Sequence, residues 1–222
     1  MVIYAKGCHP PFCRPELVRS EVEKIRAAVG LDRIDVFVLH RDDPAFPVAA
    51  FADALLDEIS AGRIAAFGVS NWTVARTREL KDRLAELGSS DLVAFSNHFS
   101  LAEMVSAPWP GCLAATTGEL AELGEMGLKL LAWSSLATGY FAGGEPPSWA
   151  STTNEARRAR ARELATHRGT SATAIALAYV LNQPEHVLPV VGTTTPAHLE
   201  EALAAADIDL SADELSWLET AS

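Results

Sequence analysis

The chain has 222 residues, 49% of them hydrophobic, and carries a formal net charge of −11 with a pI near 5.0. This acidic balance argues against nucleic-acid or anionic-membrane binding as a main role, because both partners attract basic proteins. No apolar run approaches the roughly 20 residues of a membrane span, and Lys6 and His9 interrupt the early apolar run that a signal peptide needs.

The three cysteines lack CxxC spacing, which favours a reducing, cytoplasmic location over a disulfide framework. Cys8, His9 and Cys13 match no common zinc spacing, so no metal site is predicted. The high content of Ala, Arg and Gly indicates a bacterial genome rich in GC. The length favours one domain over residues 1–222.

Short apolar segments alternate with helical patterns along the whole chain. Residues 34–39 are apolar on both faces, which is typical of a strand buried on both sides in a parallel sheet. With the helical pattern over residues 47–60 and the apolar run over 64–69, this stretch predicts a parallel βαβ unit. The predicted strands cover residues 2–5, 34–39, 64–69, 92–96, 128–133 and 187–191. The predicted helices run from Arg14-Pro15-Glu16 to Gly30 and over residues 47–60, 73–87, 116 or 117–126, 153–167, 171–182, 196–206 and 211–220.

Polar side chains stand at the ends of the first three strands. Lys6 follows the first, His40 the second, and Ser70 and Asn71 the third. Because β/α barrels place their chemistry at the C-terminal ends of their strands, we expect these side chains to gather at one rim. Tyr4 points to the same side of its strand as Lys6 and is interpreted as a core residue rather than a substitute acid.

Two of the strands carry motifs of a known family. Residues 34–40 read IDVFVLH and residues 67–71 read FGVSN, with Gly62-Arg63-Ile64 leading into the second motif. These resemble the fourth and fifth strands of the aldo-keto reductases, which commonly read iDLyllH and iGvSN. The resemblance implies a (β/α)₈ barrel in which the six predicted strands are strands three to eight. We therefore expect an incomplete or modified barrel of six parallel strands, truncated on its N-terminal side.

The resemblance also implies a reaction, the nicotinamide-dependent reduction of a small carbonyl substrate. The family uses a tyrosine as proton donor, a lysine that lowers its pKa, an aspartate paired to that lysine, and a histidine that orients the carbonyl. By position the lysine is Lys6 and the histidine is His40, and no Asp or Tyr here takes the other two places. The alternatives are a non-catalytic barrel remnant that binds a cofactor or partner, or the C-terminal part of a larger reductase. Without a catalytic role, Lys6 would be a solvated residue at the end of a strand, and His40 would be a residue of the core.

The cofactor residues follow from the same resemblance. Ser70 and Asn71 match the pair that holds the nicotinamide carboxamide, and Trp133 matches the aromatic residue that stacks on the ring. Asn97 or Ser96 stands near the family's amide-bearing glutamine. The second interpretation of Trp133 is a packing residue of the barrel.

Residues 191–202, which follow the last strand, resemble the family's phosphate- and adenine-binding loop. A helix N-terminus with hydroxyls is a suitable phosphate cradle, His198 stands where a basic residue is expected, and Glu201 matches the adenine contact. A plain capped helix is the alternative. The implied cofactor is NADP, with NAD as the second choice, and its assigned residues are Ser70, Asn71, Asn97, Trp133, Ser134, Leu136, Gly192, Thr193, Thr194, His198 and Glu201.

Six strands do not close an eight-stranded barrel without adjustment, so the strands at residues 2–5 and 187–191 would leave exposed edges. We predict pairing through these edges, either in a homodimer or with a complementing chain. The Gly/Pro-rich loop over residues 139–151 is predicted to be a lid or binding loop. Candidate walls for the substrate, whose identity the sequence does not give, are Trp72, Trp109, Tyr140 and Trp149.

Overall fold

The computed structural model describes residues 1–184 and 187–220. Six parallel strands form one sheet in the chain order β1-β2-β3-β4-β5-β6, which confirms the predicted strand set. The strands are β1 (Tyr4–Gly7), β2 (Ile34–Leu39), β3 (Ile64–Ser70), β4 (Leu92–Ser96), β5 (Lys129–Ala132) and β6 (Val187–Pro189). The α-helices of the described residues are α1 (Val18–Val29), α2 (Val48–Ser60), α3 (Val74–Glu86), α4 (Thr117–Glu125), α5 (Thr152–Arg168), α6 (Ala172–Leu181), α7 (Pro196–Ala204) and α8 (Ala212–Glu219).

The chain divides into two compact units. The first comprises Met1–Ser96 and Thr117–Leu130, and the second comprises Asn97–Thr116 and Leu131–Ser222. Within residues 1–184 and 187–220, no helix combines the length and the apolar character that crossing a membrane requires.

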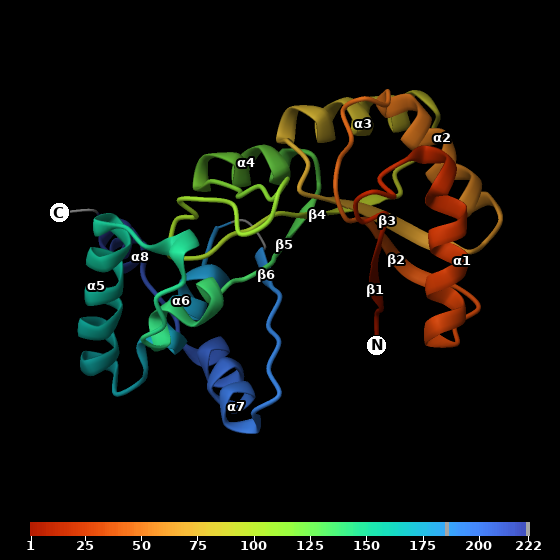
Figure 1. Ribbon diagram of the computed structural model, residues 1–222. Coiled ribbons are helices and arrows are strands. Elements are labelled where there is room, and N and C mark those ends of the chain that lie inside the picture. Colours follow the sequence, from red (N-terminus) through yellow and green to blue (C-terminus); the bar gives the residue numbers. More distant parts are fainter. Residues whose placement is uncertain (185–186, 221–222) are drawn as a thin grey trace. The chain divides into compact units, whose positions relative to one another are not determined.

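The first unit is organised around β2 and β3. The apolar run of β2 is almost completely buried, as its pattern predicts, and β1 and β3 pair with it on either side. Helices α1, α2 and α3 lie outside these strands (Figure 1). Gly68 allows β3 to approach β4 closely, since a Cβ there would lie only 2.7 Å from the carbonyl oxygen of Ala94.

Strand β1 begins two residues later than predicted. Its pairing with β2 starts at Tyr4 opposite Val36, so Lys6 lies inside the strand and opposite Val38 rather than after its end. Cross-strand pairing fixes the register, and a single-strand pattern does not contain it. Tyr4 is 45% exposed, so the interpretation of Tyr4 as a core residue was wrong.

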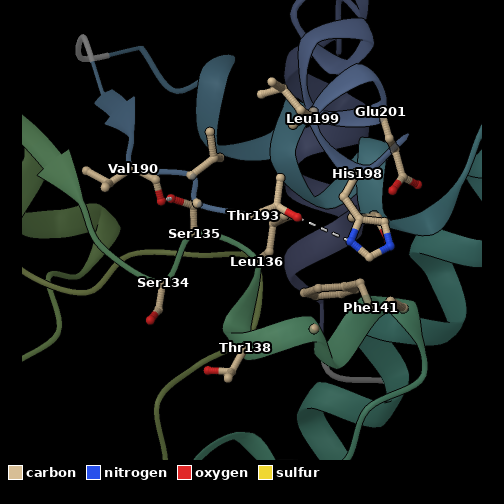
Figure 2. A pocket seen from close by; sticks show the side chains of 16 residues that line it. Ser134, Ser135, Leu136, Thr138, Phe141, Val190, Thr193, His198, Leu199 and Glu201 are labelled. Atoms are coloured by element: carbon tan, nitrogen blue, oxygen red, sulfur yellow. Dashed lines mark hydrogen bonds between the residues drawn. The ribbon is translucent and has the colours of Figure 1, made fainter. Parts of the chain in front are cut away.

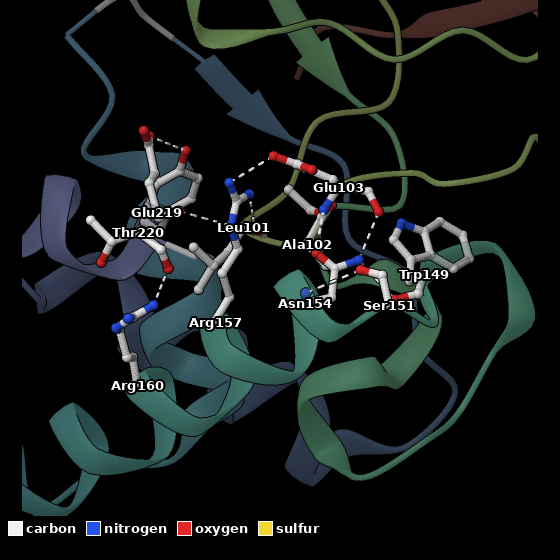
Figure 3. A network of polar contacts seen from close by, with 12 residues as sticks. Leu101, Ala102, Glu103, Trp149, Ser151, Asn154, Arg157, Arg160, Glu219 and Thr220 are labelled. Carbon is white, nitrogen blue, oxygen red and sulfur yellow. Dashed lines mark hydrogen bonds and ion pairs between the residues drawn. The ribbon is translucent and has the colours of Figure 1, made fainter. Parts of the chain in front are cut away.

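The second unit is built around α6. Seven of the ten residues of α6 are buried, and the helix contacts α5, α7 and β6. The guanidinium group of Arg157 on α5 forms hydrogen bonds with the segment at residues 101–103 and with the end of α8 (Figure 3). It donates to the carbonyl oxygen of Leu101 at 2.9 Å, to the carboxylate of Glu103 at 2.7 Å and to the carbonyl oxygen of Glu219 at 3.2 Å.

The predicted loop over residues 139–151 contains two short 3₁₀ helices, η2 (Ala137–Ala142) and η3 (Pro147–Trp149). Tyr140, Phe141 and Trp149 are each 2–3% exposed. Burial of these rings offsets the cost of the positive φ angles at Ala137 and Thr138. The segment is therefore a packed part of the unit rather than an open loop.

Candidate functional site

Lys6 anchors a polar cluster in the first unit. Its Nζ atom donates to the hydroxyl of Ser96 at 2.8 Å and to that of Ser70 at 3.1 Å. The Ser70 hydroxyl donates in turn to the carbonyl oxygen of Ser96 at 2.6 Å. Because Ser70 and Ser96 are fully buried at the ends of β3 and β4, they hold the lysine head group at the C-terminal side of the strands.

Asn71 connects this lysine cluster to His40. Its backbone has a φ of 56°, which turns the side chain back over the strand ends. The Nδ2 atom donates to the Ser70 hydroxyl at 3.0 Å and to the carbonyl oxygen of His40 at 3.3 Å. The structure thus brings together four residues that the sequence predicts for the site, namely Lys6, His40, Ser70 and Asn71.

The imidazole of His40 is held in its neutral form. Burial, followed by the nearby charges of Arg41, Lys6 and His9, lowers its pKa from 6.5 to about 4. The ring of His9 meets that of His40 edge-to-face, with their centroids 4.7 Å apart. A neutral imidazole can donate one hydrogen bond to a carbonyl oxygen without giving up a proton.

The low pKa of His40 predicts a pH-dependent stability. Between pH 6.5 and about 4 the unfolded chain binds a proton at this residue that the folded chain does not, so the free energy of unfolding falls as the pH is lowered through this window. In His40→Gln we expect the free energy of unfolding to decrease less over this pH range than in wild type, as measured by denaturant unfolding at several pH values. The control is His167→Gln, because His167 is exposed. Identical pH profiles for wild type and His40→Gln would contradict this.

The second unit contains a cavity of about 690 Å³ (Figure 2). Its size lies in the range of about 300–1,000 Å³ that is usual for small-molecule and cofactor sites. Hydroxyl groups and apolar side chains share its wall, and Figure 2 labels His198 and Phe141 among its side chains. The lining residues are Ser134, Ser135, Leu136, Thr138, Gly139, Phe141, Ala142, Thr173, Val190, Val191, Gly192, Thr193, His198, Leu199, Glu201 and Ala202.

Most of the cofactor residues predicted for this unit line the cavity. They are Ser134, Leu136, Gly192, Thr193, His198 and Glu201. The His198 ring lies 3.5 Å from the Thr193 hydroxyl, and Glu201 accepts a hydrogen bond from Ser171. The other three predicted residues, Asn97, Trp133 and Thr194, lie outside its lining. Asn97 accepts a hydrogen bond from the backbone of Trp133 at 3.3 Å.

Sequence reasoning missed several of the residues that build these two sites. It left Ser96 as an alternative to Asn97, although the Ser96 hydroxyl is the nearer partner of Lys6. The candidate walls were Trp72, Trp109, Tyr140 and Trp149, and none of them lies in the lining of this cavity, whereas Phe141 does. Both rings of the run Tyr140-Phe141 are buried, and the run itself does not reveal which of them faces the cavity. In the part of the chain that the structure describes, no group of three or more His, Cys, Asp or Glu residues is arranged to hold a metal ion.

Comparisons with known proteins agree on one family. A model described as "Aldo/keto reductase family" matches residues 1–222. A 6-dehydroglucose reductase of Agrobacterium fabrum is 27% identical over 203 residues, covering 91% of this chain and 61% of that protein. An aldo-keto reductase of Fusarium vanettenii is 26% identical over 224 residues, covering 90% of this chain and 55% of that protein.

A solved structure confirms the fold. The crystal structure of a thermostable aldo-keto reductase, Tm1743, with the inhibitor epalrestat matches with a TM-score of 0.73 at 21% identity. The match covers 100% of this chain and 72% of the other. The chain spans less than two thirds of the length of the curated relatives given above.

Proposed function

Because the chain belongs to the aldo/keto reductase family, we propose that it is an oxidoreductase that transfers a hydride between a nicotinamide cofactor and a carbonyl or alcohol substrate. The observation that carries this proposal is the cluster of Lys6, His40, Ser70 and Asn71, which the family resemblance selects and which the first unit gathers. The name of the Agrobacterium relative, a 6-dehydroglucose reductase, supports carbonyl reduction as the shared chemistry.

In this proposal the first unit acts on the carbonyl oxygen. The neutral His40 donates a hydrogen bond to that oxygen and orients it, which fits its lowered pKa. The Lys6 ammonium group stabilises the negative charge that develops on the oxygen, as positioned cations do in many active sites, and gives that oxygen the proton that completes the alcohol. Ser70 and Ser96 hold the ammonium group in place through their hydroxyls.

The cavity of the second unit fits a nicotinamide dinucleotide in size and in its wall of apolar side chains with a few hydroxyl groups. Thr193 and the start of α7 would hold a phosphate, because a helix N-terminus favours anions. Ser134, Leu136 and His198 would contact the rest of the ligand. When bound, the reduced cofactor supplies the hydride. NADPH is the first choice from the family resemblance, and NADH is the second.

Cofactor titration tests this assignment. We expect the purified chain to bind NADPH or NADH with quenching of tryptophan fluorescence. His198→Ala should weaken this binding about three- to tenfold, because the proposed contact of the His198 ring with the cofactor is lost. The control is His167→Ala, because His167 is exposed on α5 and lies outside the cavity lining. Absence of binding to either cofactor at millimolar concentration would contradict the proposal.

Turnover of simple aldehydes then separates the proposed reductase from a binding protein. The reductase predicts cofactor-dependent turnover that is lost in His40→Ala while cofactor binding persists. Cofactor binding without any turnover would instead support the alternative of a non-catalytic barrel or of one part of a larger reductase.

A further inference from the structure

The cavity of the second unit is lined by segments that contain no lysine or arginine. One part of the lining comes from residues 134–142, which carry no charged side chain. The rest lies between residues 173 and 202, and no lysine or arginine occurs anywhere in residues 169–222. Among the described residues that line the cavity, the ionisable groups are the imidazole of His198 and the carboxylate of Glu201. This lining therefore offers a phosphate group neither of the two side chains that bind phosphate most strongly.

The carboxylate of Glu201 is held at the cavity wall by Ser171. As the N-cap of α6, the Ser171 hydroxyl accepts a hydrogen bond from the backbone N–H of Ala174 at 3.0 Å. It donates its single proton to the Oε1 atom of Glu201. Because a carboxylate has two oxygens with several lone pairs and no proton, Glu201 can accept further hydrogen bonds from a ligand but cannot donate any. Glu201 and His198 are three positions apart on α7, so they project from the same side of the helix (Figure 2).

An anchored carboxylate distinguishes the two nicotinamide dinucleotides. They differ at the 2′ position of the adenosine ribose, which carries a hydroxyl in NADH and a phosphate in NADPH. A hydroxyl can donate to the carboxylate, whereas the phosphate adds about 1.5–2 negative charges near neutral pH and is repelled by it. The width of a cavity of about 690 Å³ is comparable to the Debye length, which is about 8–10 Å near physiological ionic strength, so salt does not fully screen a phosphate in it from Glu201.

We propose that Glu201 determines the cofactor specificity of the protein and that the cavity selects NAD(H) against NADP(H). This inference rests on the proposed function and reverses the order of cofactors that the family resemblance implies. The hydroxyl of Ser171 contributes by holding the carboxylate in place. His198 does not replace a basic residue for the extra phosphate, because an imidazole is not permanently charged as a lysine or arginine is.

Removing the charge of Glu201 without changing the shape of the side chain tests this assignment. In Glu201→Gln the amide oxygen can still accept from Ser171, but the negative charge at the cavity is gone. The matched control is Glu200→Gln, because Glu200 is exposed, precedes Glu201 on the same helix and lies outside the cavity lining. Both variants change the net charge of the protein by the same amount.

Isothermal titration calorimetry with NADH and with NADPH gives the two dissociation constants of each variant, once circular dichroism has shown that the variant is folded. We expect wild type and Glu200→Gln to bind NADH at least about tenfold more tightly than NADPH. Glu201→Gln should bring the two constants within about threefold of each other, mainly through tighter binding of NADPH. The inference is overturned if wild type binds NADPH as tightly as NADH, if the ratio is unchanged in Glu201→Gln, or if Glu200→Gln changes it equally.

Adding a positive charge to the cavity is the second test. Leu199→Lys places an ammonium group in the lining, whereas Leu203→Lys places one at an exposed position of α7 outside it. We expect Leu199→Lys alone to strengthen NADPH binding relative to NADH binding, by about tenfold. Equal ratios in the two lysine variants would contradict a specificity that arises from the charge of the cavity. Failure of wild type to bind either dinucleotide would instead overturn the proposed function, and this inference with it.

Discussion

Replacing Asn154 by alanine is expected to lower the free energy of unfolding by about 3 kcal/mol or more, because the change removes three buried hydrogen bonds. Asn154 is fully buried in the first turn of α5. Its Oδ1 atom accepts from the N–H of Glu103 at 2.9 Å, and its Nδ2 atom donates to the carbonyl oxygens of Glu103 at 2.8 Å and Trp149 at 2.7 Å (Figure 3). Denaturant unfolding followed by circular dichroism measures the loss.

An isosteric variant shows whether hydrogen bonding or volume is responsible. Asn154→Asp keeps the acceptor for Glu103 but turns a carboxylate oxygen toward two carbonyl oxygens, so we expect a loss at least as large as that of Asn154→Ala at neutral pH. Thr152→Ala, which changes an exposed residue of the same turn, should stay within about 0.5 kcal/mol of wild type. If Asn154→Asp unfolds at the same denaturant concentration as wild type, the three hydrogen bonds contribute little to the free energy of unfolding.

The strands and most of the helices could be predicted because their signals are local. The run of residues 34–39 is apolar on both faces, and β2 forms there with the same bounds. Gly30 was predicted to stop the first helix, and it caps α1 in the left-handed conformation. The third helix was predicted to begin at Thr73, and Thr73 is the N-cap of α3, where its side chain accepts a hydrogen bond from the backbone of Arg76. In each case the short-range chemistry of the residue agrees with the final fold.

The parts that could not be predicted depend on contacts between residues far apart in the chain. His98 meets Trp133 and Trp149, which lie 35 and 51 positions away, and nothing in its neighbours marks it as the centre of a network. The same holds for Ser96, which reaches Lys6 across 90 positions. The family resemblance selected Lys6 and His40, but only the packed strands reveal the hydroxyls that hold the lysine.

Replacing Lys6 by methionine is expected to reduce turnover at least about 100-fold, the usual contribution of a positioned proton-transfer or charge-stabilising group. Methionine keeps most of the length of the side chain but removes the ammonium group that donates to Ser70 and Ser96. Steady-state reduction of an aldehyde that wild type turns over measures the effect. Cofactor binding should be unchanged, because Lys6 lies outside the lining of the cavity.

A second readout of Lys6→Met does not depend on activity. The charge of Lys6 is one of the causes that lower the pKa of His40 to about 4, so removing it should raise that pKa toward 6.5. NMR titration of the His40 ring measures the shift, and Lys24→Met, at an exposed lysine of α1, should leave both turnover and the titration unchanged. If the pKa of His40 is the same in Lys6→Met as in wild type, the charge of Lys6 does not act on the imidazole. The polar cluster would then lack the coupling through which the lysine charge and the neutral imidazole act on one carbonyl oxygen.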